Sequence, residues 1–130
     1  MNEFRIFYEG LNQPAFAPAP EVFGVAWAII YPLIIAAGVY LLVRSIQGRL
    51  PAWLFGVYLL NIFFNLLFTP LEWEFGLAVG TVVIFLVLGT LGYLLYRLYG
   101  RGWVIFSLLL PYFLWVSFAT LLQVSLLILN

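Results

Sequence analysis

The sequence predicts an all-α membrane protein: a polytopic bundle of four transmembrane helices that follows a proline-rich surface loop. Hydrophobic residues make up 66% of the 130 residues, and charged residues make up only 8%. The mean hydropathy is +1.15, whereas a soluble domain usually has about 25% charged residues. A helix needs about 20 apolar residues to cross a hydrocarbon core, and the chain has room for four such stretches. We therefore treat residues 1–130 as a single transmembrane domain.

The residue types that the chain lacks exclude several classes of function. There is no cysteine and no histidine, so disulfides, thiol chemistry and the usual zinc and haem ligands are excluded. No metal site is expected, and no cofactor is required. The net charge is zero and no basic patch exists, which argues against nucleic acid as a partner. The first twenty residues lack the basic and apolar regions of a cleavable signal peptide.

Residues 1–20 read as a polar and aromatic lead-in, MNEFRIFYEGLNQPAFAPAP. Its three prolines favour an extended path and predict that no regular helix forms there. Tyr8 and Phe16 would then be large aromatic groups on a restrained loop at the membrane surface. Two interpretations stay open for them, namely interfacial anchors or a lid over a site below.

Prolines and apolar runs set the expected limits of the four spans. The spans are expected at about 21–43, 51–69, 74–96 and 103–129. Pro51 is expected to begin the second span, and Pro70 to end it. Pro32 and Pro111 lie inside the first and fourth spans, where each should bend the helix axis.

Charge predicts the orientation of these spans in the lipid bilayer. The first and third connections carry the arginines Arg44, Arg49, Arg97 and Arg101, whereas the second carries Glu72 and Glu74. By the positive-inside rule, the arginine connections are cytoplasmic and both termini lie outside. The default host membrane is a bacterial cytoplasmic membrane.

Polar and aromatic residues form a stripe on three of the spans, at helical spacing. The stripes are Gly24, Trp27, Tyr31 and Gly38 in the first span, Tyr58, Asn61, Asn65 and Phe68 in the second, and Tyr112, Trp115, Ala119 and Gln123 in the fourth. Asparagine at hydrocarbon depth is costly unless it is buried in the bundle, so these stripes should face a common interior. They either line a cavity or only hydrogen-bond to neighbouring helices.

The remaining patterns favour packing and anchoring. Small residues in the third span, Gly76, Gly80, Gly89 and Gly92, predict close helix packing. Trp53, Trp73 and Trp103 lie near span starts and are typical of the interfacial aromatic belt, so no chemistry is assigned to them. Trp27 and Trp115 lie deeper, where an indole N–H needs a partner or a ligand.

Three blocks of this sequence resemble the TspO/MBR family, the translocator or tryptophan-rich sensory proteins. They are LNQPAFAPAPEVFGVAWAIIY at 11–31, LNIFFNLLF at 60–68 and PYFLWVSFATLLQ at 111–123. The resemblance implies a porphyrin-binding pocket between helices, capped by the proline-rich loop. Carried over by position, its lining would be Tyr8, Phe16, Trp27, Tyr31, Asn65, Phe68, Trp115 and Ala119. In certain bacterial members two pocket tryptophans support light- and oxygen-dependent breakdown of protoporphyrin, and the matching residues are Trp27 and Trp115.

The resemblance also shows departures, and it leaves three functions open. Family members have five spans, so this chain is expected to lack the first transmembrane helix. The favoured function is a receptor, sensor or carrier for a porphyrin-like tetrapyrrole or a similar flat hydrophobic ligand. The first alternative is a structural subunit that uses the groove left by the missing helix to join a partner membrane subunit or a homo-oligomer. The second is photo-oxidative porphyrin degradation, in which Trp27 and Trp115 would be the only catalytic residues.

Overall fold

The computed structural model describes the backbone of residues 2–130 and the side chains of residues 5–130. Residues 2–130 form helices and connections without any β-strand. The helices are α1 (Asn2–Glu9), α2 (Pro20–Ile46), α3 (Ala52–Phe75), α4 (Leu77–Leu98) and α5 (Trp103–Leu129). The last four are long and apolar enough to cross a membrane. The predicted all-α class with four spanning helices is therefore confirmed.

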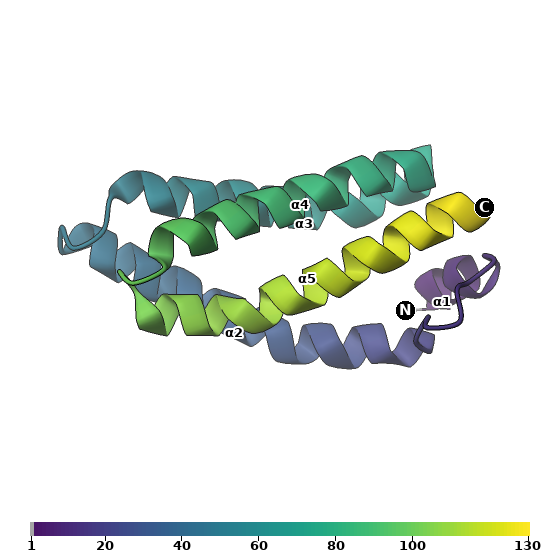
Figure 1. The fold of residues 1–130 in the computed structure, drawn as a ribbon, viewed down its shortest axis with the longest axis horizontal. Helices are drawn as coiled ribbons and strands as arrows, with labels where there is room; N and C mark the ends of the chain where they lie inside the picture. Colours follow the sequence, from purple (N-terminus) through teal and green to yellow (C-terminus); the bar gives the residue numbers. More distant parts are fainter. Residues whose placement is uncertain (1) are drawn as a thin grey trace.

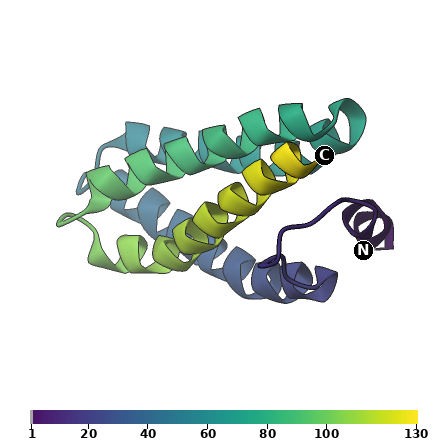
Figure 2. The ribbon, with the colours of Figure 1, turned by 45° about the vertical axis from the view of Figure 1, so that its right-hand side comes forward.

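The four long helices run up and down as an antiparallel bundle (Figure 1). Helix α4 packs between α3 and α5, α5 packs on α2, and α2 returns to contact α3. The connections between α2 and α3 and between α4 and α5 lie at one end of the bundle (Figure 1). Helix α1 and both ends of the chain lie at the other end (Figures 1 and 2). Residues 2–19, which we call the N-terminal arm, therefore lie at the end of the bundle where α5 ends.

Apolar side chains fill the interior and also cover the outside. The fully buried core includes Ile34, Leu41, Leu54, Leu91, Leu94 and Leu109. The outward faces of the helices carry exposed aliphatic and aromatic residues, such as Ile35, Leu66 and Val82. Water would not favour so much apolar surface, whereas lipid tails would cover it without cost. The chain is thus an integral multi-pass membrane protein.

The expected end of the second span at Pro70 is wrong. Helix α3 continues through this proline to Phe75. A proline removes only one backbone donor, and neighbouring helices let a membrane helix tolerate that loss. The helix ends instead at Gly76, whose φ of 96° is accessible mainly to glycine, and whose N–H donates to the carbonyl oxygen of Glu72 at 2.8 Å. Glu72 therefore belongs to a helix and not to a connection.

The expectation that residues 1–20 contain no helix is also wrong. Helix α1 covers Asn2–Glu9, and only the segment that follows it is irregular. Proline restricts itself and the residue before it, and the first proline of the chain is Pro14. Helix α1 ends at Glu9, so Pro14 restricts none of its residues. The extended path predicted from the prolines is found at Ala19, whose φ of −61° and ψ of 150° place Pro20 at the start of α2.

The glycines of α4 differ in what they contact. A Cβ added to Gly80 would lie 2.6 Å from Oε1 of Glu72, so a larger residue cannot be accommodated there without a shift. A Cβ on Gly92 would make an ordinary contact, at 3.6 Å from the ring of Phe113, and one on Gly89 would meet nothing within 4 Å. Close packing of α4 within the chain is thus seen at Gly80 and not along the whole glycine series.

The arginines of the first and third connections meet at one end of the bundle. Arg44, Arg49 and Arg101 line a hollow of about 340 Å³ there. The guanidinium carbon of Arg97 lies 4.8 Å from the centre of the Trp53 ring, which is typical of a cation–π contact. This end carries the charge that the positive-inside rule assigns to the cytoplasm, and the orientation itself stays a prediction.

Candidate functional site: a cavity beneath the N-terminal arm

A cavity with a volume of about 530 Å³ lies inside the bundle at the end covered by the N-terminal arm. Helices α2, α3, α4 and α5 form its walls, and α1 contributes Phe7 and Tyr8. Most of the lining is apolar or aromatic, with a few polar groups. This size and composition are typical of sites that enclose a small molecule.

Seven of the eight residues predicted to line a pocket do line this cavity. They are Tyr8, Trp27, Tyr31, Asn65, Phe68, Trp115 and Ala119. Part of each stripe of α2, α3 and α5 therefore faces one shared space. The stripe residues Gly38, Tyr58, Asn61 and Tyr112 are buried elsewhere in the bundle. Whether these side chains bind a ligand stays a prediction.

Phe16 is not placed with the other predicted lining residues. Its side chain is 46% exposed, and its ring packs edge-on against Phe118 with 6.2 Å between centroids. The N–H of Ala17 donates to the carbonyl oxygen of Pro14 at 3.1 Å, which closes a turn that contains Phe16. This turn leaves Phe16 against the outside of α5. The geometry suits an interfacial anchor, the first of the two interpretations offered for it.

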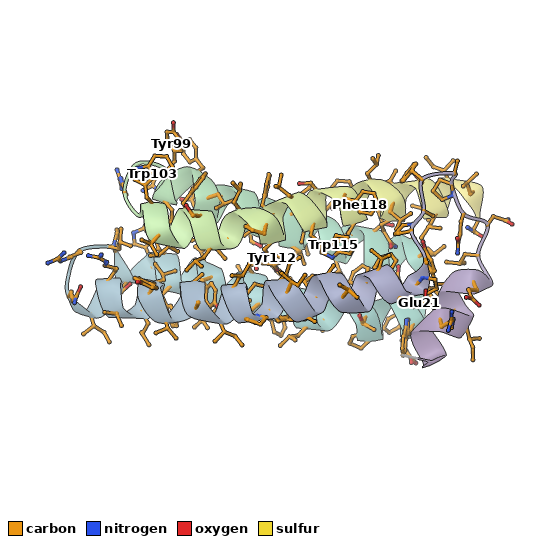
Figure 3. The ribbon with its side chains drawn as sticks, turned by 90° about the horizontal axis from the view of Figure 1, so that it is seen from below. Glu21, Tyr99, Trp103, Tyr112, Trp115 and Phe118 are labelled. Atoms are coloured by element: carbon orange, nitrogen blue, oxygen red, sulfur yellow. The ribbon has the colours of Figure 1, made fainter. Side chains whose placement is uncertain are left out.

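An aromatic wall built from α2 and α5 forms one side of the cavity. The rings of Trp27 and Tyr31 are stacked, with centroids 4.9 Å apart. Trp115 meets Trp27 edge to face at 6.4 Å and Phe23 at 5.6 Å. Figure 3 shows Trp115 and Tyr112 of α5 directed toward α2. The two helices thus present π faces and ring edges to whatever enters the cavity.

A chain of hydrogen bonds holds the polar part of this wall in place. The hydroxyl of Tyr31 donates to Oδ1 of Asn65 at 3.0 Å, and Nδ2 of Asn65 donates to the hydroxyl of Tyr112 at 2.8 Å. Tyr112 donates in turn to Oδ1 of Asn61 at 2.8 Å, and Asn61 donates to the hydroxyl of Thr90 at 2.9 Å. The chain joins all four long helices. It also satisfies one donor and one acceptor of Asn65, which leaves this amide one N–H and one lone pair for a ligand.

The indole nitrogen of Trp115 is the exception in this satisfied network. Among the described side chains, it is the buried polar atom that has no hydrogen-bond partner. An unpartnered buried donor is unfavourable, and in a native protein it calls for an explanation such as a missing ligand. Trp115 lines the cavity with its ring, whereas its indole nitrogen is covered by protein atoms, so an acceptor would reach that nitrogen only after its neighbours move.

The N-terminal arm forms a lid that polar contacts fasten to the bundle at two points. Nδ2 of Asn130, at the end of α5, donates to the carbonyl oxygen of Asn12 at 3.0 Å. Arg5 pairs with Glu9 within α1 and with Glu21, and the second ion pair joins α1 to α2. Within the arm, the hydroxyl of Tyr8, which is only 2% exposed, donates to the carbonyl oxygen of Pro18 at 2.7 Å. Burial raises the pKa of the Tyr8 hydroxyl above its usual value.

The lid also has an apolar contact with the bundle. Tyr8 forms a small buried cluster with Leu122 and Leu126 of α5, and its ring lies edge-on to Phe23 with 5.2 Å between centroids. Of the two interpretations left open for Tyr8, the geometry supports the lid.

Glu72 is the lining residue that the sequence reasoning missed. The carboxylate is 6% exposed and accepts a hydrogen bond from Nε2 of Gln123 on α5. The same nitrogen donates to the carbonyl oxygen of Leu77 at 3.2 Å. Because Pro70 was expected to end the helix, Glu72 was placed in a connection. The sequence does indicate that Glu72 faces the cavity, because Glu72 follows Asn65 by seven residues and that spacing returns to the same helix face.

The chemistry available in the cavity is limited. Glu72 is the only charged residue among the lining side chains that the structure describes. Within residues 5–130, no group of three carboxylates lies close enough to hold a metal ion. The site therefore offers aromatic surface, hydrogen-bonding groups and one carboxylate, which together suit binding.

A comparison with known proteins identifies the family to which this chain belongs. A model of the TspO/MBR family matches residues 1–129. The chain belongs to the TspO/MBR family. The tryptophan-rich protein TspO of Bacillus cereus is 32% identical over 120 residues, which cover 92% of this chain and 77% of that protein. Membership of the TspO/MBR family suggests a membrane sensor or receptor of the TspO type.

Proposed function

We propose that this TspO/MBR protein binds a porphyrin-like tetrapyrrole, or a similar flat hydrophobic molecule, in the cavity beneath the N-terminal arm. The observation that carries the proposal is the convergence of Trp27, Asn65 and Trp115, from three helices, on one space of about 530 Å³. Stacked and edge-on rings form a surface on which a planar macrocycle can lie. The ring of Trp115 adds to that surface, because it lines the cavity edge to face with Trp27.

The test is a titration of the purified protein with protoporphyrin IX in a neutral detergent. Binding should quench tryptophan emission and shift the porphyrin absorption band to a saturable end point. Because removal of a tryptophan changes the quenching itself, variants are compared through the porphyrin absorption. Trp115→Phe removes part of the aromatic surface that lines the cavity and should weaken binding about tenfold.

Trp103→Phe is the matched control, because Trp103 is exposed at the opposite end of the bundle (Figure 3). This variant should bind the porphyrin as the natural protein does. A folded protein that shows no saturable change with protoporphyrin, or with other flat hydrophobic molecules, would overturn the proposal.

A second candidate function is the light-dependent oxidation of a bound porphyrin by dioxygen. The edge-to-face contact of Trp27 and Trp115 in the cavity lining favours it, since tryptophan is oxidisable and both rings would touch the bound molecule. Illumination of the complex in air and under argon tests this candidate. Faster bleaching in air than that of free porphyrin, lost in Trp115→Phe at saturating ligand, would support it. Equal bleaching rates for bound and free porphyrin would exclude it.

A further inference from the structure

The charge of the cavity restricts the ligand that it can accept. Glu72 is buried near the end of α3, and the described lining residues include no lysine or arginine. Arg5 is paired with Glu9 and Glu21 outside the cavity. The other arginines lie in or beside the connections at the far end of the bundle (Figure 1). The protein itself therefore supplies no countercharge for this carboxylate.

The carboxylate is held in a defined position. Nε2 of Gln123 donates to Oε1 of Glu72, and Gln123 is anchored by its second hydrogen bond to the carbonyl oxygen of Leu77. Gly80 leaves the room that this arrangement needs, because a Cβ there would lie 2.6 Å from Oε1. Oε2 has no hydrogen-bond partner among the described residues, and it is not one of the fully covered polar atoms. One oxygen thus positions the group, and the other is open to the cavity.

Aromatic rings line the same cavity as Glu72. Phe68 and Trp73 lie on the same helix as Glu72, and Trp27, Tyr31 and Trp115 line the cavity from the facing helices. Ring faces attract cations, and the attraction is strongest where water is excluded. A buried carboxylate without a partner is unfavourable, and a cation or an N–H donor removes that penalty. Both features favour a ligand that carries a cation or an N–H donor, whereas a carboxylate on the ligand would be repelled.

We propose that the molecule bound in this cavity presents a protonated amine, or another N–H-donating nitrogen, to Oε2 of Glu72. The inference rests on the proposed function, because it concerns the ligand of the same cavity. For a tetrapyrrole, it places a nitrogen near Glu72 and any carboxylate side chain away from it. The cavity therefore discriminates flat ligands by charge as well as by shape.

Three flat probes of nearly equal size test the inference: a cationic aminoacridine, neutral anthracene and an anthracene carboxylate. Each is titrated into the full chain in a neutral detergent, with tryptophan quenching as the readout. The natural protein should bind the cation about tenfold more tightly than anthracene, as expected for a charge-assisted contact. The anionic probe should bind the weakest.

Glu72→Gln keeps an acceptor for Gln123 and removes the charge, so it should fold and lose the preference for the cation. Its affinities for the cation and for anthracene should become similar. Glu74→Gln is the matched control, because it removes the same charge from an exposed residue two positions further along the chain. That variant should keep the preference.

Equal affinities for the three probes, or a preference that survives in Glu72→Gln, would overturn the inference and leave the proposed function intact. A loss of preference in Glu74→Gln as well would also overturn it, since charge near the surface would then be the cause. Failure of the probes to bind, while protoporphyrin binds, would again overturn the inference alone. Failure of every flat ligand would overturn the proposed function itself.

Discussion

Nδ2 of Asn65 donates a hydrogen bond of 2.8 Å to the hydroxyl of Tyr112, and this bond joins the cavity to the core of the bundle. Asn65 lines the cavity, whereas Tyr112 is buried and donates onward to Asn61. The orientation of the Asn65 amide is therefore set in part by Tyr112, which does not line the cavity. Changes in the core should reach the site through this contact.

Tyr112→Phe should destabilise the protein and weaken ligand binding together. The change leaves Nδ2 of Asn65 and Oδ1 of Asn61 without their partner, and hydrogen bonds between membrane helices contribute about 1 kcal/mol each. Thermal unfolding in detergent should show a lower midpoint. Tyr96→Phe is the control, because Tyr96 is 75% exposed and should be neutral. Equal midpoints for the two variants would mean that the network contributes nothing to stability.

Gly38→Ala should destabilise the bundle by about 1–3 kcal/mol, the usual cost of overpacking. A Cβ at this position would lie 2.6 Å from Cζ of Tyr58, whose hydroxyl is fixed by a bond of 2.8 Å to the carbonyl oxygen of Ile34. The ring cannot move without breaking that bond. Unfolding by heat or by a denaturing detergent measures the loss.

Gly89→Ala provides the contrast to Gly38→Ala. An added Cβ at Gly89 meets no atom within 4 Å, and alanine favours a helix by about 1 kcal/mol over glycine. The variant should therefore be neutral or more stable. A clear loss of stability would show that α4 packs against another molecule at this glycine.

The helical spans and the inward stripes could be predicted from the sequence because each depends on a local pattern. Length and hydropathy define a spanning helix, and a spacing of three and four defines one face. Trp27, Asn65 and Trp115 reach the same cavity for that reason. The partners within the stripes could not be predicted, because the link from Asn65 to Tyr112 depends on how α3 and α5 are rotated against each other.

The errors at Pro70 and in α1 have a common cause. In both places a proline was given a wider effect than its ring has, since it removes one donor and restricts one preceding residue. In a membrane bundle, tertiary contacts sustain a helix through such a residue. The same error removed Glu72 from the predicted site. The prediction for Phe16 was wrong because it was carried over from the family by position in the sequence. Position in the sequence does not give the turn that sets the direction of the ring.

Tyr8→Ala should loosen the N-terminal arm much more than Arg5→Ala. Tyr8 contributes a buried ring and a hydrogen bond to Pro18, and burial of one such ring stabilises by about 1.5–3 kcal/mol. Both ion pairs of Arg5 involve exposed side chains, and exposed ion pairs contribute little to stability. Hydrogen exchange of the amide of Asn12, which donates to Oδ1 of Asn130 at the end of α5, reports the opening.

The expected exchange rates differ between the two variants. Exchange in Tyr8→Ala should rise by about tenfold or more, and in Arg5→Ala by about threefold or less, since 1.4 kcal/mol corresponds to a factor of ten. A larger effect for Arg5→Ala would show that the ion pairs, and not the buried ring, hold the lid closed.

The orientation in the membrane can be tested by labelling single cysteines, because the natural chain has none that would react. Gln47 is exposed in the connection that carries Arg49, and Glu74 is exposed near the other end of the bundle. If the arginine connections are cytoplasmic, a membrane-impermeant maleimide should label Glu74→Cys in intact spheroplasts and Gln47→Cys only after lysis. The reverse pattern would place the cavity and its lid on the cytoplasmic side. The cavity is lined by Phe7 and Tyr8 of α1, so this result also decides on which side of the membrane the covered end of the cavity lies.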